Sequence, residues 1–206
     1  MDLRLYEELN GFADRHEWAE EILRFFATDG QLIFLALLAA IFLVRGKYLS
    51  RNGRHGVIAA GFSAALALLV AQIIAAAWDR PRPYEADPGD AHLLLPSSPD
   101  PSFPSDHATG AFAIAVAIGL RHRKAGSLAL VLASLVSLGR VALGTHYPSD
   151  ALGGAALGAG AALLLWIPPV RGPLRRLADR LGEIYDGLAA RLGVRVRQAL
   201  RGGRTH

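Results

Sequence analysis

The 206-residue sequence contains no cysteine and only one methionine. Without cysteine, the chain can form neither a disulfide framework nor a thiolate metal site. The first ten residues are polar and acidic, so they lack the basic and apolar regions of a cleavable signal peptide. We therefore expect no cleaved leader, no disulfide-stabilised domain and no cysteine-ligated metal.

Charge is also missing over long stretches. Five runs contain no acidic or basic side chain apart from His55 at the start of one, and they cover residues 30–44, 55–78, 108–120, 126–139 and 151–168. Runs of about twenty apolar residues match the hydrocarbon core of a bilayer, and shorter runs need extension at their ends. The sequence thus predicts an all-α fold, a polytopic membrane helix bundle of about five spans. The alternative is a soluble helical bundle, but the core helices of such bundles seldom lack a polar face.

Basic residues follow alternate runs. They form three groups after the first, third and fifth runs: Arg45, Lys47, Arg51 and Arg54; Arg121, His122, Arg123 and Lys124; and Arg171, Arg175, Arg176 and Arg180. All three groups lie on one side if each run crosses once, and short basic loops mark the cytoplasm. We therefore attribute the net charge of +4 to basic residues on a cytoplasmic membrane face, and not to a nucleic-acid-binding surface. The acidic N-terminus, residues 79–106 and residues 144–150 would then lie outside.

The two ends of the chain differ from its apolar centre. Residues 1–29 have an apolar face at helical spacing, which predicts one or two interfacial helices with a break at Gly11 or, alternatively, helices docked onto the bundle. Residues 170–206 carry a leucine stripe among arginines, which predicts a basic amphipathic helix on the inner leaflet. The predicted domains are an interfacial segment 1–29, a transmembrane core 30–169 and a basic cytoplasmic tail 170–206.

Small and polar residues within the runs predict contacts between helices. Residues 153–160 read Gly-Gly-Ala-Ala-Leu-Gly-Ala-Gly, and small residues four apart let helices approach closely in lipid. Gln72, Ser134 and Ser137 are expected to form hydrogen bonds between helices. For Gln72 we prefer this packing role to a direct role in a site.

Three short polar clusters interrupt the apolar chain at the predicted outer ends of the spans. They are Asp79-Arg80-Pro81-Arg82-Pro83, Phe103-Pro104-Ser105-Asp106-His107, and Arg140 with His146 and Asp150. Arginine forks suit phosphate oxygens, and a histidine paired with a carboxylate suits nucleophilic or base chemistry. Clusters far apart in sequence would share one membrane depth, which favours a single phosphate-ester or diphosphate site. The alternative is three unrelated groups that cap loops.

The first cluster and Ser105 supply candidate anion contacts. Arg82 lies between two prolines, so its backbone is extended and suits an arginine that must point at a phosphate. Arg80 shares this loop but could instead pair with Asp79. Ser105 stands where a predicted helix begins, so we expect it to cap the helix and to contact phosphate at the same helix end.

The second and third clusters supply candidate acid–base groups. His107, at the head of the predicted helix, could protonate a leaving oxygen, while Asp106 is either a helix-start charge or a partner for a nearby cation. Arg140 ends an uncharged run, where an arginine is costly unless it meets an anion. His146 and Asp150 have i,i+4 spacing, so the carboxylate could hold one imidazole nitrogen and leave the other free to attack phosphorus.

The three clusters together resemble the three signatures of the type-2 phosphatidic acid phosphatase family. The form with Asp106, and with His-Tyr-Pro in the third cluster, is most similar to the bacterial undecaprenyl-diphosphate phosphatases of the bacitracin-resistance type. The resemblance implies dephosphorylation through a phosphohistidine with no metal or other cofactor, and a fold shared with vanadium haloperoxidases. The roles it implies are nucleophile for His146, orienting partner for Asp150, acid for His107, and phosphoryl-oxygen contacts for Arg82, Ser105 and Arg140.

Three positions depart from the family pattern. Ala75 stands where the first signature usually has lysine, so one positive charge is absent or is supplied by Arg80. Gly139 stands where the third signature usually opens with serine, which puts one hydroxyl contact in doubt. Asp106 stands where glycine is more frequent. We include Arg80 and Asp106 among the residues of the phosphate site.

We therefore predict an integral-membrane phosphatase that converts undecaprenyl diphosphate to undecaprenyl phosphate, with its active site on the outer side of a bacterial inner membrane. Paired acid and base groups predict a bell-shaped pH profile for kcat/KM. The expected partners are a polyprenyl or phospholipid phosphate substrate and membrane lipid. A phosphatidylglycerophosphate or phosphatidate phosphatase is one alternative, and a non-catalytic protein that binds or transports lipid phosphates is another. The sequence carries no signal for an oligomeric state.

Overall fold

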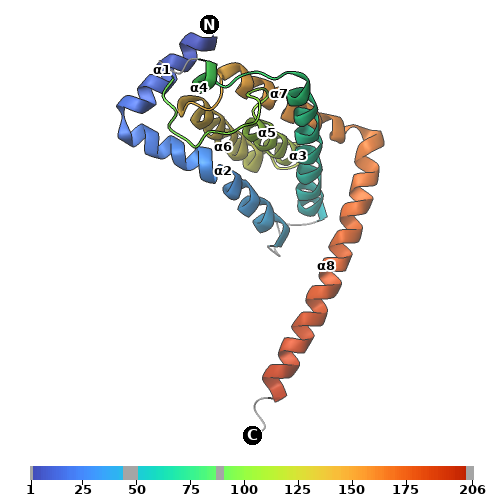
Figure 1. Ribbon diagram of the computed structural model, residues 1–206. Coiled ribbons are helices and arrows are strands. Elements are labelled where there is room, and N and C mark those ends of the chain that lie inside the picture. Colours follow the sequence, from blue (N-terminus) through green and yellow to red (C-terminus); the bar gives the residue numbers. More distant parts are fainter. Residues whose placement is uncertain (1, 44–50, 87–90, 203–206) are drawn as a thin grey trace.

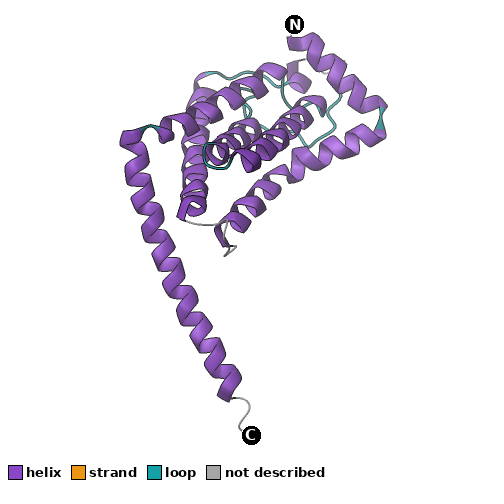
Figure 2. Cartoon of the chain, turned by 180° about the vertical axis from the view of Figure 1, so that it is seen from behind, coloured by secondary structure: helices purple, strands orange, loops and turns teal. Residues whose placement is uncertain are grey.

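The computed structural model describes residues 2–43, 51–86 and 91–202, and every regular element within them is a helix (Figures 1 and 2). In chain order these are α1 (Asp2–Arg15), α2 (Glu17–Leu43), α3 (Arg51–Ala77), α4 (Pro83–Ala86), α5 (Asp106–Gly119), α6 (Arg123–Ala142), α7 (Pro148–Trp166) and α8 (Pro168–Gly202). The predicted all-α class is confirmed.

Helix α5 lies at the centre of the bundle and packs against α3, α6 and α7 (Figure 1). Ser105 caps its N-terminus, and its alanines favour helix while keeping its surface narrow. Ala108, Ala113 and Ala115 are fully buried against these neighbours. The narrow surface of α5 lets three other helices approach it, and the second polar cluster lies at its N-terminal end.

Within the described residues, three helices are long and apolar enough to cross a membrane: residues His55–Ala77 of α3, together with α6 and α7. These correspond to the predicted runs 55–78, 126–139 and 151–168. The run 108–120 forms α5, a shorter apolar helix. Its 14 residues extend about 21 Å, less than the ~30 Å of a hydrocarbon core. The chain is a multi-pass membrane protein whose central helix is enclosed by longer ones.

The first apolar run forms the C-terminal part of α2, which is continuous from Glu17 to Leu43. The predicted boundary between residues 29 and 30 therefore lies inside a helix. Gly30 lies within α2 and does not break it. The glycine allows α2 to lie close to α6, because a Cβ at this position would overlap the side chain of Val136. The charged residues before Gly30 change the polarity of the helix without ending it.

The N-terminal helix α1 is docked onto the bundle, as in the second of our two interpretations. Tyr6 and Asn10 are almost fully buried, and the amide of Asn10 donates to the carbonyl oxygens of His92 (2.8 Å) and Ala142 (2.9 Å). The predicted break at Gly11 is wrong. The helix ends after Arg15, and the His16 carbonyl accepts hydrogen bonds from the first turn of α2.

The C-terminal segment is one helix, α8, which leaves the bundle and extends away from it (Figure 1). Its glycines at 182, 187 and 193 do not interrupt it. The first turns of α8 pack against α3 and α7. A helical tail was predicted here, and its placement on an inner leaflet stays a prediction.

Helix α7 approaches α5 through glycines, which confirms the predicted packing role of residues 153–160. A Cβ at Gly154 would lie 2.5 Å from the Ser105 carbonyl oxygen. A Cβ at Gly158 would overlap the Thr109 carbonyl oxygen. Both obstacles are backbone atoms, which cannot move without shifting a helix, so only glycine allows this separation. The contact places the start of α7 beside the start of α5.

The variant Gly158→Ala should therefore be destabilised by about 1–3 kcal/mol through overpacking. The matched control is Gly160→Ala on the same helix, where an added Cβ has no neighbour within 4 Å. The stability of this control should be unchanged or should rise by about 0.5–1 kcal/mol, because alanine has a higher helix propensity than glycine. Thermal unfolding in detergent measures both, and equal melting temperatures would contradict the packing argument.

Candidate active site

A cavity of about 100 Å³ lies at the N-terminal end of α5, and all three polar clusters contribute to its wall. The residues that line it are Gln72, Ala75, Arg82, Ser98, Asp100, Pro101, Pro104, Asp106, His107, Arg140 and His146. Two arginines and two histidines from distant parts of the sequence thus face one space. Helix α3 ends here, α5 begins, α6 ends and α7 begins.

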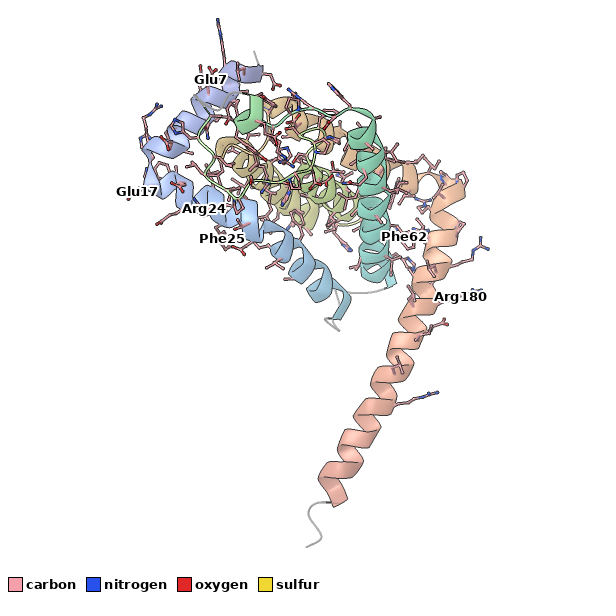
Figure 3. All side chains as sticks on the ribbon, viewed as in Figure 1. Glu7, Glu17, Arg24, Phe25, Phe62 and Arg180 are labelled. Atoms are coloured by element: carbon pink, nitrogen blue, oxygen red, sulfur yellow. The ribbon has the colours of Figure 1, made fainter. Side chains whose placement is uncertain are left out.

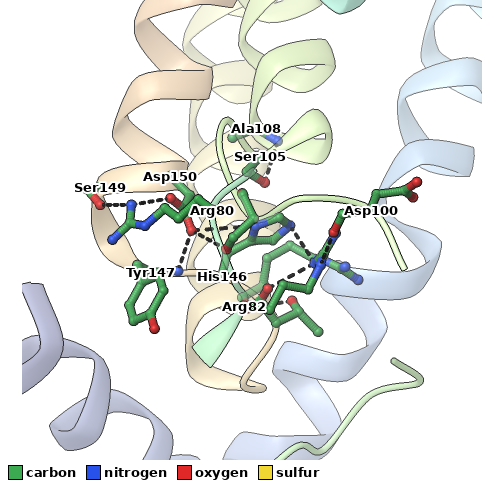
Figure 4. Close-up of polar contacts among 12 residues, drawn as sticks. Arg80, Arg82, Asp100, Ser105, Ala108, His146, Tyr147, Ser149 and Asp150 are labelled. Carbon is green, nitrogen blue, oxygen red and sulfur yellow. Dashed lines mark hydrogen bonds and ion pairs between the residues drawn. The ribbon is translucent and has the colours of Figure 1, made fainter. Parts of the chain in front are cut away.

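Arg82 is held in place by uncharged oxygen atoms. Its Nε donates to the Asp100 carbonyl (2.8 Å) and its Nη1 to the Thr145 carbonyl (2.9 Å), while Nη1 lies 3.4 Å from His146 Nε2 (Figure 4). The side chain is only 5% exposed. Carbonyl oxygens fix a guanidinium without cancelling its charge, so Arg82 can attract an anion in the cavity.

Arg140 lies in the last turn of α6 with its guanidinium at the cavity. Its backbone carbonyl accepts hydrogen bonds from Thr145 and His146, so this turn is tightly folded. Its side-chain Nε is buried and has no hydrogen-bond partner. A buried donor without an acceptor is costly. The acceptor that satisfies it is therefore expected to be a ligand oxygen in the cavity.

His146 is 2% exposed and has its two ring nitrogens in different surroundings. Its Nδ1 lies 2.9 Å from the Ser102 carbonyl oxygen, which can only accept, so Nδ1 carries the proton. This tautomer leaves Nε2 without a proton in the cavity wall, where its lone pair has one long contact, to Arg82 Nη1 at 3.4 Å. Burial lowers the pKa of His146 below its ordinary 6.5, although the nearby Asp150 acts in the opposite direction. The neutral, nucleophilic form is thereby favoured.

Asp150 was expected to hold His146 directly, and the structure shows an indirect arrangement. Its Oδ2 is 3.8 Å from His146 Nδ1, too far for a hydrogen bond. The same Oδ2 accepts from the Ser102 hydroxyl (2.6 Å) and from the Tyr147 backbone N–H (2.8 Å), as Figure 4 shows for Tyr147. Asp150 therefore positions Ser102, and the Ser102 carbonyl positions His146.

Arg80 was included among the phosphate-site residues, but it does not line the cavity. Its Nη1 donates to Asp150 Oδ1 (2.5 Å) and Ser149 Oγ (2.7 Å), and its Nη2 donates to Asp2 Oδ2 (2.9 Å). The guanidinium also lies 4.3 Å from the centroid of the Tyr147 ring. With two carboxylates as partners, its charge is already balanced. Arg80 therefore supports Asp150 and does not replace the missing lysine at Ala75.

Ser105 caps α5 as predicted, because its hydroxyl accepts from the Ala108 N–H at 3.5 Å. Its own N–H donates to the Asp150 carbonyl at 3.1 Å, which joins the second cluster to the third. Ser105 is fully buried and is not part of the cavity wall, whereas Pro104 and Asp106 are. The expected contact between its hydroxyl and phosphate stays a prediction.

The structure shows the surroundings of the three positions that depart from the family pattern. Ala75 lines the cavity, so a lysine at this position would have placed its positive charge in the site, and alanine does not. Gln72, one helical turn earlier, also lines the cavity and donates to Asp106 Oδ2 at 2.9 Å. Gln72 thus forms the predicted contact between helices and also belongs to the site. At Gly139 a Cβ would lie 2.7 Å from the Leu23 carbonyl oxygen, so α2 occupies the space of a serine side chain.

Sequence reasoning missed Ser102, Ser149 and Asp2. Ser102 acts through both its hydroxyl and its backbone carbonyl. Asp2 accepts from the Ser149 backbone N–H (2.9 Å) and from Arg80, and so ties α1 to the start of α7. Burial raises the pKa of Asp2, but hydrogen bonds from Ser149 and Arg80 outweigh this, and the pKa is below its ordinary 3.8. Within the described residues, no group of three or more His, Asp or Glu side chains is placed to hold a metal ion.

Comparisons with known proteins agree with this architecture. A family model described as the PAP2 superfamily matches residues 56–171. The chain is 31% identical over 153 residues to undecaprenyl-diphosphatase BcrC of Bacillus subtilis, covering 74% of this chain and 76% of BcrC. The crystal structure of Aquifex aeolicus LpxE has a TM-score of 0.66 at 24% identity and covers 79% of this chain and 93% of LpxE. A PAP2-type phosphatidylglycerolphosphate phosphatase from Bacillus subtilis has a TM-score of 0.53 at 24% identity, with 79% and 83% covered. The two structural likenesses concern the fold.

The contacts of Asp2 predict a pH-dependent stability. Asp2→Asn should lower the melting temperature at pH 7 by about 2–4 °C, as expected for the loss of ~1 kcal/mol from partly exposed charge-assisted hydrogen bonds. Because the folded-state pKa of Asp2 is lowered, its contribution is complete above its ordinary 3.8 and is lost as the pH falls through the folded-state value.

Melting curves of the wild type and Asp2→Asn, recorded from pH 7 to pH 3, measure this contribution. The difference between them should shrink toward the acidic end. Glu7→Gln, an exposed carboxylate on the same helix, is the matched control (Figure 3). A difference that does not vary with pH, or one that the control reproduces, would contradict the role of Asp2.

Proposed function

The chain belongs to the PAP2 superfamily and is a membrane phosphatase of that family, and we propose that it hydrolyses undecaprenyl diphosphate to undecaprenyl phosphate. One observation carries this proposal: a single cavity contains an un-neutralised Arg82, an Arg140 whose Nε lacks a partner, and a neutral His146 whose unprotonated Nε2 lies 3.4 Å from Arg82 Nη1. Two guanidiniums beside a nucleophilic imidazole suit the terminal phosphate of a lipid diphosphate.

In the first step, His146 Nε2 attacks the terminal phosphorus and the bond from phosphorus to the bridging oxygen breaks. His107, in the first turn of α5 and in the cavity wall, donates a proton to the leaving lipid phosphate. The incoming phosphate favours the protonated ring of His107, because opposite charges attract in a buried site. Arg82 and Arg140 hold the oxygens of the phosphoryl group while negative charge develops on them.

In the second step, water attacks the phosphohistidine and His107 accepts its proton, which releases inorganic phosphate and restores His146. His146 Nδ1–H donates a hydrogen bond to the Ser102 carbonyl in both steps, and this bond stabilises the positive ring of the intermediate. Asp150 acts through Ser102, and Arg80 and Asp2 hold Asp150 in turn. We assign these three charged residues to positioning.

Asp106 was counted among the phosphate-site residues, but an ionised carboxylate repels phosphate oxygens. Its Oδ2 accepts from Gln72, and we propose that the pair shapes the wall of the cavity beside His107. The N–H groups at the start of α5 are the donors from this helix that suit an anion, and Ser105 caps the helix end that presents them.

The identity of the lipid is supported by the likeness to BcrC, whose name gives undecaprenyl diphosphate as its substrate. The described basic groups lie at the opposite ends of α5 and α7 from the cavity, which favours a cytoplasmic side there and a cavity that faces outward. We therefore propose a bacterial inner membrane location with hydrolysis at the outer leaflet. Phosphatidylglycerophosphate and phosphatidate are the alternative substrates.

Phosphate release from these three lipids by the full chain in detergent, with chelator present, tests the proposal. We expect kcat/KM to be at least about tenfold higher for undecaprenyl diphosphate, a difference of ~1.4 kcal/mol in transition-state binding. His146→Ala should lose at least about 10³-fold in kcat, because it removes the nucleophile. His122→Ala, at the other end of the bundle, is the matched control and should retain activity.

Each arm of this assay has a distinct contrary result. Faster hydrolysis of a phospholipid would replace the proposed substrate. Activity that disappears with chelator would refute the metal-free mechanism, and full activity in His146→Ala would refute the nucleophile assignment. No release from any of the three lipids would favour the non-catalytic binding protein.

A further inference from the structure

A second set of polar residues lies at the opposite end of the bundle from the cavity. Here α3 begins, α5 and α7 end, and α8 begins. The 19 residues of α7 separate this end from the catalytic cavity by about 28 Å, close to the thickness of a bilayer core. The two sites are therefore on opposite sides of the membrane if α7 crosses it.

Three arginines gather at this junction. The guanidiniums of Arg121 and Arg171 each lie 5.0 Å from the centroid of the Trp166 ring. Burial, together with the nearby charges of Arg175 and Arg171, lowers the pKa of Arg121. In the part of the chain that the structure describes, none of these three arginines forms an ion pair with a carboxylate. Like charges held together in this way repel unless an anion lies between them.

Two buried nitrogen atoms at the junction lack partners. Arg121 Nε has no acceptor, and His55 Nδ1 has no hydrogen bond. His55 is 7% exposed, and its Nε2 lies 2.9 Å from Asp179 Oδ1 on α8. The next residue, Gly56, faces Arg121, since a Cβ there would lie 3.2 Å from Arg121 Cδ. His55 and Arg121, the two side chains with an unsatisfied nitrogen, therefore lie close to each other.

We propose that this junction of α3, α5, α7 and α8 binds a phosphate group, carried by the headgroup of an anionic lipid in the leaflet opposite the catalytic cavity. Guanidinium forks match phosphate oxygens, and a buried Nε–H needs such an acceptor. Basic pockets between membrane helices on the cytoplasmic side are suited to lipid headgroups, and a tryptophan beside them is typical of the interface.

A bound headgroup would join the loop after α5 to the start of α8. Arg121 follows α5, while Arg171 belongs to the first turn of α8. One phosphate between them would fix the start of α8 against the bundle. The hydrogen bond between His55 and Asp179 lies further along α8 and would hold the same orientation. The site would thus anchor the helical tail to the membrane-embedded part of the chain.

Binding measurements on the full chain in detergent test this proposal with three probes: dioleoylphosphatidylglycerol, dioleoylphosphatidylcholine and inorganic phosphate. The wild type should bind the anionic lipid at least about tenfold more tightly than the zwitterionic one. Arg121→Gln and Arg171→Gln should each weaken that binding about fivefold, the effect expected for one basic residue near an anionic headgroup. Native mass spectrometry resolves the bound lipid, and thermal stabilisation gives the affinity.

Arg180→Gln removes the same charge from an exposed position on α8 and is the matched control (Figure 3). It should leave the affinity unchanged. If inorganic phosphate alone saturates the site and displaces the lipid, the phosphate site is supported and its occupant is a soluble anion. Arg121→Lys keeps the positive charge and tests whether weaker binding comes from a folding defect. This variant should bind the anionic lipid more weakly than the wild type but melt at a similar temperature.

Two results would overturn the proposal. The first is equal affinity of the wild type for the anionic and zwitterionic lipids, a measurement that needs no variant. The second is an equal loss of affinity in Arg180→Gln and Arg121→Gln, which would mean that the basic tail attracts anions without a defined site.

Discussion

The site depends on a positive charge that is fixed in position but not neutralised. Arg82 is oriented by two carbonyl oxygens, and Arg140 keeps a buried Nε with no partner. Arg80, only two residues before Arg82, is in the opposite situation, because its guanidinium is bound to Asp2 and Asp150. This loop therefore carries one arginine that faces the cavity, Arg82, and one that is bound to carboxylates of the protein, Arg80. Without this separation, the cavity would lose either the un-neutralised charge of Arg82 or the carboxylate that positions Ser102 and His146.

The narrow packing around α5 brings these charges together. Glycines on α7 and buried alanines on α5 let the two helices approach until the Ser105 N–H meets the Asp150 carbonyl. That hydrogen bond joins the second polar cluster to the third. The chain from Asp150 through the Ser102 hydroxyl and carbonyl to His146 Nδ1 depends on the same proximity. The packing of the membrane helices thus fixes the surroundings of His146 through a few backbone contacts.

Much of this arrangement could be predicted from the sequence, because residue type and hydropathy carry it. Uncharged runs predicted the spanning helices, and the polar clusters that contain Arg82, His107, Arg140 and His146 predicted a common site. The boundary inside α2 could not be predicted, because charged residues before Gly30 do not end a helix. The true partner of His146 is a backbone carbonyl, which every residue possesses, so the i,i+4 spacing favoured Asp150 instead. Asp2 lies 147 positions from Ser149, and no local pattern links them.

We propose that Arg82, Arg140 and His146 bind one tetrahedral anion. A structure of the full chain with bound orthovanadate, a phosphate analogue, would show whether these three residues contact it. The predicted result is vanadium bonded to His146 Nε2, with its oxygens within hydrogen-bond distance of both guanidiniums and with Arg140 Nε satisfied. Vanadate bound elsewhere, or held in the cavity with Arg140 Nε still without a partner, would contradict the account.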